Sequence, residues 1–449
     1  MNSEQTPPPA HPEVGERVRV TVETLATGGD GVARHRGFTL FVPRSAPGDL
    51  LDVEITEVAR NYGRARICAV VQPGADRIPT PCPLADGCPG CSLQHLHYQA
   101  QLAAKQSFVR DGLERIGRLR DVEVLPTIGM ATPWEYRNKG EFVAEQCDGR
   151  IRLGYHGDDH RFLPLTGCPL QHPLSMHILQ EVEIVATAMK LPLAQLITRV
   201  SPGEHPAALA ILICWDEHPR LLEAAELLRE RVPELAGVLW SRVRGRSLVR
   251  RSLAEVLSGA GKLRQRLGRW EYQVSAESFF QVNNEQAARL VELAEGMVGD
   301  MRGALFADVY CGVGTFLIPL AAHAGRAIGI EEHPIAIADA QENLARSAVH
   351  DVHLYESRVE TILPRLLRKG RAVDVALLDP PRKGAGRAVL ENLAQLGAAR
   401  IVLVSCDPAT LGRDAGDLAI LGYRLESVQP IDMFPQTWHV ESIALLTKT

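Results

Sequence analysis

The chain has 449 residues, of which 45% are hydrophobic and 23% are charged, and its formal net charge at pH 7 is −5. This balance describes a globular protein with room for two or three domains, and it gives no argument from total charge for a nucleic-acid partner. No apolar run approaches the roughly 20 residues of a transmembrane helix, so we expect no membrane contact. Residues 1–13 are polar and proline-rich, without the apolar core of a signal peptide. We therefore expect a disordered tail on a cytoplasmic protein.

The N-terminal part carries strand and turn signals. Residues 14–71 hold short strand-like runs separated by GGDG, RHRG and APGD, and this spacing predicts a small β-barrel. Apolar positions at helical spacing predict a helix from about Tyr98 to Ile116. The rest of residues 72–270 mixes strands and helices without a clear period, and we expect a central α+β domain there.

A group of cysteines lies in this central region. CPLADGCPGC places Cys82, Cys88 and Cys91 within ten residues, and Cys168 follows in the turn-like TGCP. Thiols this close together favour metal ligation in a reducing compartment over disulfides. Four thiolates can hold zinc or a [4Fe-4S] cluster, and spacing alone does not separate the two. Three other cysteines are expected to be core residues: Cys68, Cys147 and Cys214.

The segment from Trp240 to Trp270 holds nine Lys or Arg residues and one acid, Glu255. A charge run is most often a solvated face, but arginines two apart on a strand-like stretch with Trp at both ends fit RNA contact equally well. Arg244 and Arg246 are our candidate phosphate contacts.

From residue 303 strands and helices alternate regularly, which predicts a doubly wound α/β domain. Its first strand runs into the glycine-rich turn DVYCGVGTF, and the next strand ends at Glu331 about 20 residues on. Glycines let the backbone approach a ligand, and a carboxylate in this place can accept hydrogen bonds from ribose hydroxyls. The turn lacks the full dinucleotide fingerprint, so S-adenosylmethionine fits it better than NAD.

Two later strands of this domain end in residues that carry chemistry. LLDPPRKG places Asp379 at a strand end, where two prolines stiffen the loop. The next strand runs into SCDPATLGRD and delivers Cys406 to the edge at which ligands bind in α/β sheets. A DPP step alone would also fit an adenine N-methyltransferase, but an aromatic residue usually follows those prolines, and here Arg382 follows.

Five motifs together resemble the RNA uracil-5-methyltransferases: SFFQVN (278–283), DVYCGVGTF, LLDPPRKG, SCDPATLGRD and DMFPQTWHVES (432–442). The resemblance runs from about residue 14 to the C-terminus. The 23S rRNA branch looks nearer, because the N-terminal barrel resembles a TRAM domain and the cysteine loop resembles their iron-sulfur motif. The fold implied is α/β, with a TRAM barrel over 14–71, a central domain over 72–270 and a Rossmann-like, S-adenosylmethionine-dependent methyltransferase domain over 271–449.

The chemistry of uracil agrees with this resemblance. Uracil C5 is too weak a nucleophile to take a methyl group from a sulfonium unless a thiolate first adds at C6, and Cys406 is the expected nucleophile. Glu441 is a carboxylate in an otherwise apolar final strand, which makes it the expected base for the C5 proton. Asp379 is expected to face the uracil or the methyl donor.

The resemblance implies further ligand contacts. A uracil in folded RNA must be flipped out of its stack, and Phe279 matches the family position on which it would lie, although core packing explains this residue nearly as well. An Asn is frequent in the family where this chain has Thr315, and we interpret Cys311 as a packing residue. The resemblance favours a structural [4Fe-4S] cluster over zinc, held by the four cysteines named above. Six residues are expected to contact the cofactor: Gln281, Tyr310, Gly312, Gly314, Glu331 and Asp379.

Three other functions fit the sequence less well. A radical-S-adenosylmethionine methylthiotransferase also combines a TRAM domain with a cluster, but its CxxxCxxC spacing differs from the spacing here. A non-catalytic RNA-binding protein would not need Cys406 and Glu441, and an RNA cytosine-5-methyltransferase would carry a cysteine after the strand-end proline. The sequence favours 23S rRNA as substrate with tRNA as the alternative, and it indicates no obligate protein partner.

Overall fold

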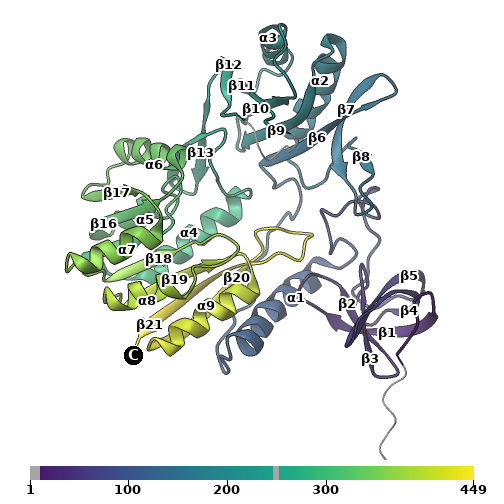
Figure 1. The fold of residues 1–449 in the computed structure, drawn as a ribbon, viewed down its shortest axis with the longest axis horizontal. Coiled ribbons are helices and arrows are strands. Elements are labelled where there is room, and N and C mark those ends of the chain that lie inside the picture. Colours follow the sequence, from purple (N-terminus) through teal and green to yellow (C-terminus); the bar gives the residue numbers. More distant parts are fainter. Residues whose placement is uncertain (1–10, 246–251) are drawn as a thin grey trace, which may run out of the picture. The chain divides into compact units, whose positions relative to one another are not determined.

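The computed structural model describes residues 11–245 and 252–449. Most of the expected tail, and Arg246, therefore lie outside the described residues. The chain forms two compact units (Figure 1). One consists of the chain up to Phe108 together with Phe434–His439, and the other consists of Val109–Met433 with Val440–Thr449.

A closed five-stranded barrel opens the first unit, with strand order β1-β2-β3-β5-β4 (Figure 1). Its core is filled by the alternate residues of each strand, such as Val18, Val20 and Val22 of β1, which are at most 8% exposed. This alternation is the period-two pattern of a strand with one buried face, and it confirms the predicted barrel. The strands are β1 (Arg17–Leu25), β2 (Gly31–His35), β3 (Phe38–Val42), β4 (Leu50–Val58) and β5 (Tyr62–Gln72).

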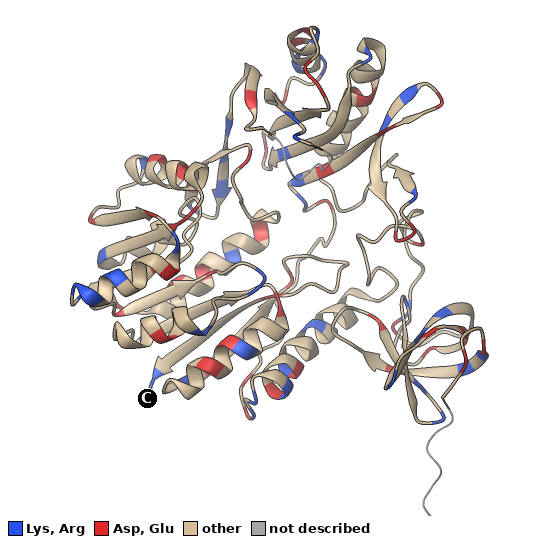
Figure 2. Cartoon of the chain, in the orientation of Figure 1, with Lys and Arg blue, Asp and Glu red and all other residues tan. Residues whose placement is uncertain are grey.

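Charges on the barrel surface are largely paired. Arg19 donates to Asp52 at 2.7 Å, and Glu54 accepts from both Arg17 and Arg66. Figure 2 shows basic and acidic residues interspersed along these strands. RNA phosphates would therefore compete with carboxylates for the barrel arginines, each exposed pair being worth at most about 1 kcal/mol.

The predicted helix is present as α1 (Tyr98–Asp111), which continues into a π-helical turn, η1 (Gly112–Ile116). The turn packs against helix α9 (Pro408–Ile420) through glycines. A Cβ at Gly112 would lie 2.2 Å from the carbonyl oxygen of Pro408, and one at Gly412 would lie 2.1 Å from that of Gly112. Only residues without a side chain allow the two backbones to approach this closely.

The second unit contains a seven-stranded sheet, β12-β11-β10-β9-β6-β7-β8, that could not be ordered from the sequence. All its neighbouring strands run antiparallel except β10 and β11. The elements are β6 (Lys139–Cys147), β7 (Arg150–His156), β8 (Phe162–Pro164), α2 (Pro173–Met189), β9 (Leu193–Ser201), β10 (Ala207–Cys214), α3 (Leu221–Arg231), β11 (Leu235–Arg242) and β12 (Glu255–Gly259). A hairpin follows, formed by β13 (Lys262–Leu267) and β14 (Trp270–Ser275), and then helix α4 (Asn284–Val298).

A second seven-stranded sheet ends the chain, in the order β17-β16-β15-β18-β19-β21-β20. The first five strands in this order are parallel, and β21 runs antiparallel between β19 and β20. The strands are β15 (Met301–Asp308), β16 (Ala324–Glu331), β17 (Val352–Glu356), β18 (Val375–Leu378), β19 (Arg400–Ser405), β20 (Tyr423–Ile431) and β21 (Glu441–Lys448). The chain winds outward from β15 in both directions, so the crevice beside the ends of β15 and β18 is the topological switch point at which such sheets bind ligands.

Helices cover this sheet on both faces (Figure 1). One layer places α7 (Val359–Arg368), α8 (Arg387–Gln395) and α9 side by side, and their apolar residues share one core with the strands. The remaining helices are α4, the short α5 (Leu317–Ala321) and α6 (Pro334–Arg346). This is the doubly wound α/β domain that the sequence predicted.

The expected burial of three cysteines is confirmed for only one of them. Of the three cysteines expected in the core only Cys214 is buried, whereas Cys147 is partly buried and Cys68 is exposed. Cys68 lies in the last part of β5, whose residues from Cys68 to Gln72 all lie at the surface, so the apolar run there does not mark a core strand.

Among the helices of the described residues, none has the length and apolar character needed to cross a bilayer.

Candidate active site

The candidate nucleophile and base meet at one sheet edge. Cys406 follows Ser405, the last residue of β19, and Glu441 begins β21. The two strands are antiparallel neighbours, with Ser405 opposite Ser442. Continuing this register by one residue places Cys406 opposite Glu441, although 35 residues separate them in the chain. The pairing that the chemistry requires is therefore built into the ladder of the sheet.

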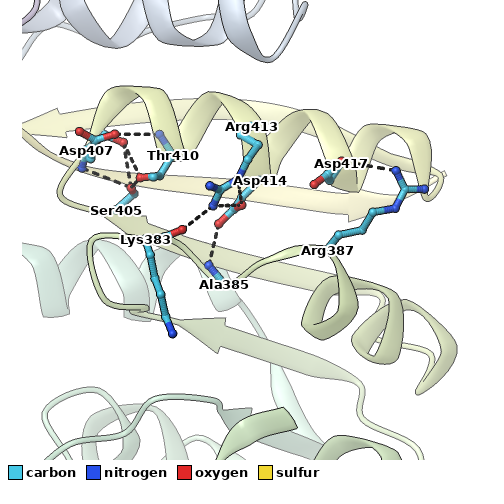
Figure 3. A network of polar contacts seen from close by, with 9 residues as sticks. All are labelled: Lys383, Ala385, Arg387, Ser405, Asp407, Thr410, Arg413, Asp414 and Asp417. Carbon is cyan, nitrogen blue, oxygen red and sulfur yellow. Dashed lines mark hydrogen bonds and ion pairs between the residues drawn. The ribbon is translucent and has the colours of Figure 1, made fainter.

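Helix α9 holds the loop that presents the thiol (Figure 3). Asp407 is its N-cap and accepts a hydrogen bond from the backbone N–H of Thr410 at 2.8 Å. The hydroxyl of Ser405 in turn donates to the carbonyl of Asp407 at 3.1 Å. Cys406 thus sits between two fixed residues, directly before a helix N-terminus, where the helix dipole favours a thiolate.

The same helix ties down the DPPRKG loop (Figure 3). Arg413 donates to the carbonyl of Lys383 at 2.7 Å, and the carboxylate of Asp414 accepts from the backbone N–H of Ala385 at 2.8 Å. Asp414 is buried and also pairs with Arg413 at 2.7 Å. The RD pair at the end of SCDPATLGRD therefore fixes the loop that begins at Asp379.

Two carboxyl groups at this edge have a raised pKa. Burial raises the pKa of Asp379 to about 7. Glu441 is 3% exposed, and burial together with the charge of Asp379 raises its pKa well above its ordinary range. Ionising both carboxyl groups is unfavourable, so the pair retains a proton near neutral pH.

The thiol is also shifted toward its neutral form. Burial and the charges of Glu441 and Asp379 raise the pKa of Cys406 to about 11, while Arg382 works in the opposite direction. A cationic ligand that offset the carboxylates would therefore favour the thiolate, which is the form that reacts.

The glycine turn follows β15 at the switch point. Gly312 and Gly314 adopt φ of 54° and 92°, values that L side chains rarely take. The N–H of Gly312 donates to the Glu331 carboxylate at 3.1 Å, so the acid at the end of β16 braces the turn. Tyr310 is partly buried against the core beneath it, and Cys311 is buried, in line with a packing role.

Asp308 is a site residue that the sequence reasoning passed over. It ends β15 and is fully buried, and neither of its carboxylate oxygens has a partner of good hydrogen-bond geometry within the described residues. The backbone N–H groups of Tyr310 and Leu317 lie close enough to oppose the change, but burial and Asp379 still raise its pKa well above the ordinary range. The available signal was an acid directly before a glycine turn. A buried acid beside that turn offers acceptor oxygens and a negative charge to a cationic nucleoside ligand.

The SFFQVN segment is fixed by a polar scaffold that sequence reasoning also missed. Arg199, buried in β9, donates to the carbonyl of Ser278, and the hydroxyl of Ser278 donates to Asp339 at 2.6 Å. Asn138 donates to the carbonyl of Gln281 at 2.9 Å. Phe280 is buried, whereas Phe279 is 70% exposed. The exposure of Phe279 removes the core-packing explanation and leaves its ring open to a base.

The basic stretch is less open to RNA than its composition implies. Several of its cations are paired: Arg242 with Asp216 at 2.6 Å, Lys262 with Asp339 and Glu342, and Arg269 with Glu295 at 2.7 Å. Arg244 is exposed and makes no ion pair with another described residue. Its predicted companion, Arg246, lies outside the described residues.

The cysteine group is not assembled as a metal site in this structure. Over residues 11–245 and 252–449, no three His, Cys, Asp or Glu side chains converge as a metal requires. Cys82, Cys88 and Cys91 are partly buried and form no disulfide within those residues. Arg44 holds their loop by donating to the carbonyls of Asp86 and Cys88. The geometry therefore does not support the expected cluster, although the thiols keep the right chemistry.

Known proteins resemble this chain over most of its length. The family model described as tRNA (uracil-5-)-methyltransferase matches residues 255–449, and the TRAM domain model matches residues 12–68. An uncharacterized RNA methyltransferase of Halalkalibacterium halodurans is 33% identical over 96% of this chain and 96% of its own length. One from Thermosynechococcus vestitus is 34% identical over 96% of this chain and 98% of its own length.

A solved structure shares the fold across the chain. The tRNA (uracil-54, C5)-methyltransferase of Pyrococcus abyssi, in complex with S-adenosyl-L-homocysteine, matches with a TM-score of 0.76 at 24% identity, covering 96% of this chain and 100% of that one. The doubly wound sheet, the family model and the relatives together show an S-adenosylmethionine-dependent methyltransferase. The chain belongs to the RNA uracil-5-methyltransferase family, as its motifs indicated, and its substrate is RNA.

Because the carboxyl groups at this edge retain a proton near neutral pH, the affinity for S-adenosylmethionine relative to S-adenosylhomocysteine should depend on pH. The two ligands differ by the sulfonium charge and methyl group, and a positive charge lowers the pKa of nearby acids, so the sulfonium should release more protons on binding. The preference should therefore grow as pH rises, by up to about tenfold per pH unit for each extra proton released, around the Asp379 pKa of about 7. Calorimetric titration of both ligands between about pH 6 and pH 8 measures it.

Asp379→Asn is the matched control, because the amide keeps the shape and cannot ionise. It should flatten the pH dependence of the ratio. A ratio that is the same at all pH values in the unmodified protein would contradict the shared-proton description of the site.

Proposed function

We propose that this protein methylates C5 of a uridine in RNA through a covalent bond between Cys406 and C6 of the base. The single observation that supports the proposal is the strand register, in which Ser405 lies opposite Ser442, so that Cys406 and Glu441 are the next residues at the same edge of the sheet. A thiol that adds and leaves, paired with a buried base, is the minimum that C5 methylation needs.

Cys406 supplies the activation. Its thiolate adds to C6, which moves electron density to C5 and the O4 enolate. The proton of the thiol passes to the Asp379 carboxylate, which leaves Glu441 able to accept the C5 proton later. The α9 N-terminus and Arg382 favour the thiolate. S-adenosylmethionine, when bound, supplies an electrophilic methyl group for C5.

Glu441 completes the turnover. Its carboxylate takes the proton from C5, the C–H electron pair forms the C5–C6 double bond, and the C6–S bond breaks to return the Cys406 thiolate. Burial raises the proton affinity of Glu441, and a base with a raised pKa takes up a proton more readily. Asp379 has one of two roles: it shares a single negative charge with Glu441, or it contacts the substrates.

The remaining candidate residues would bind the methyl donor and the RNA and orient them. The glycine turn, Tyr310 and Glu331 would hold the nucleoside part of the methyl donor, with Gln281 from the anchored SFFQVN segment. Asp308 joins this set because its buried carboxylate lacks a well-placed partner in the described residues. Phe279 offers an exposed ring on which a flipped uracil can stack, a contact worth about 1–3 kcal/mol per base. Arg244 would bind phosphate without reading sequence.

The two catalytic residues should stall the reaction at different steps. Glu441→Gln keeps the shape but cannot take the C5 proton, so addition and methyl transfer proceed and elimination stops. We expect a covalent, methylated protein–RNA complex on a denaturing gel and turnover lower by about 10²–10⁴-fold. Unmodified rRNA transcribed in vitro is the substrate, with tRNA in parallel.

Cys406→Ala, and the double variant, should give neither adduct nor product, because nothing then activates C5. Normal turnover by Glu441→Gln, or a stall without any adduct, would move the base to another carboxylate, with Asp379 first in line.

The proposed substrate is 23S rRNA. Support comes from the N-terminal barrel and the cysteine-rich loop, a combination that resembles the rRNA branch. A tRNA substrate is the second candidate, because the Pyrococcus abyssi protein named as a tRNA methyltransferase matches the chain over its full fold. Tandem mass spectrometry of rRNA and tRNA from a deletion strain should show loss of 5-methyluridine from 23S rRNA, and loss from tRNA alone would reverse the assignment.

The four cysteines are proposed to hold a [4Fe-4S] cluster with a structural role. The CPLADGCPGC spacing with Cys168, and the resemblance, support the proposal, while the described geometry does not. Protein purified without oxygen should be brown and contain about four iron and four sulfide per chain, and Cys88→Ser should lose both. Zinc without iron in elemental analysis, or neither metal, would contradict it.

A further inference from the structure

The segment that leads to the candidate base does not belong to the unit that contains the base. Phe434–His439 is part of the first compact unit, whereas the chain before it, to Met433, and after it, from Val440, belongs to the second. Glu441 comes two residues after His439. The backbone that delivers the base is therefore anchored in the N-terminal unit.

Two residues of helix α1 bind the segment. Gln101 exchanges two hydrogen bonds with Gln436: its amide donates to Gln436 Oε1 at 2.9 Å, and its Oε1 accepts from the backbone N–H of Gln436 at 3.1 Å. Lys105 donates from Nζ to the carbonyl of Phe434 at 3.0 Å. Gln101 is 1% exposed and Lys105 is completely buried.

The residues directly after Cys91 hold the other end of the segment. The hydroxyl of Ser92 accepts from the backbone N–H of Trp438 at 2.9 Å, and the N–H of Leu93 donates to the carbonyl of Gln436 at 2.9 Å. The Trp438 ring packs against the small core that contains Leu93. Backbone groups at both ends of the segment are thus fixed by the same unit.

The segment itself has little freedom. Gln436 adopts a φ of +70°, which is uncommon for a residue with a side chain. Thr437 closes a turn by donating from its hydroxyl to the carbonyl of Phe434 at 2.8 Å. A strained conformation persists only where its surroundings determine it, and here those surroundings are Gln101, Lys105 and Ser92.

Packing alone does not explain these contacts. A fully buried ammonium costs several kcal/mol of desolvation unless it is well bonded, and a methionine would fill the same space without that cost. Instead, two buried polar side chains of α1, those of Gln101 and Lys105, form hydrogen bonds with one six-residue loop.

We propose that Gln101, Lys105 and Ser92 are positioning residues that hold Glu441 in place for the elimination step. The proposal rests on the proposed function of Glu441 as the base. In that step the C5–H bond breaks with the proton going to the Glu441 carboxylate, its electron pair forms the C5–C6 double bond, and the C6–S pair returns to Cys406. Addition and methyl transfer do not use Glu441, so a displaced base slows elimination selectively. A shift of about 1 Å can cost about 10²-fold in rate.

Single-turnover experiments with Gln101→Ala, Ser92→Ala and Lys105→Met test this. Each variant should form the methylated covalent complex with in-vitro transcribed rRNA at nearly the normal rate and resolve it about tenfold to a hundredfold more slowly. The complex should therefore appear transiently on denaturing gels. Gln101→Glu, which retains the acceptor for the Gln436 N–H, should recover part of the resolution rate.

Ser45→Ala is the matched control. Ser45 is a buried serine of the same unit, its hydroxyl donates to the carbonyl of Val42 at 2.8 Å, and neither of these residues belongs to the anchored segment. It should form and resolve the complex at normal rates. Variants at Gln101 and Ser92 that slow formation and resolution equally, or resolve normally, overturn the positioning role.

The Glu441→Gln variant, measured in parallel, distinguishes failure of the positioning proposal from failure of the base assignment. If Glu441→Gln traps the complex while the anchor variants resolve it normally, only the positioning proposal is wrong. If Glu441→Gln traps no complex, the base assignment fails and the positioning proposal fails with it.

Discussion

The pairing of β19 with β21 is the interaction on which the rest of the site depends. The thiol and the carboxylate come from opposite ends of two antiparallel strands, so the register of the ladder decides whether they meet. A slip of one residue would turn every side chain of β21 to the other face of the sheet. Most apolar residues of both strands are buried, on both faces of the sheet, so the packing of these side chains against their neighbours holds that register.

This arrangement gathers acids where burial is unfavourable to them. Asp308 ends β15, Asp379 follows β18 and Glu441 begins β21. Burial raises the pKa of all three carboxyl groups, and the charge of Asp379 adds to the effect on Asp308 and Glu441. A cationic ligand beside these carboxylates would be favoured over a neutral one, which is the basis for expecting the charged methyl donor to bind better than its neutral product.

Much of the architecture could be predicted because it rests on short-range pattern. Alternation over β1 to β5 predicted the barrel, helical spacing predicted α1 with η1, and the repeated strand and helix pattern predicted the second sheet of the C-terminal half. The candidate thiol and base could be named from the sequence because SCDP and HVES combine unusual residues with strand ends. The antiparallel sheet from β6 to β12 has no comparable period, and the apolar run at Cys68 looked buried only because sequence alone cannot show where a strand extends beyond its barrel.

The sequence by itself determined which residues lie at strand ends, which turns need glycine, and which side chains carry chemistry, because these depend on neighbours a few positions away. Only the tertiary structure decided which of them meet. The pairing of Ser405 with Ser442 brings Cys406 and Glu441 to one edge of the sheet, and Gln101 binds Gln436 across 335 positions of chain. Local propensity carries no information about such partners, since the free energy that selects them comes from burying one whole core at once.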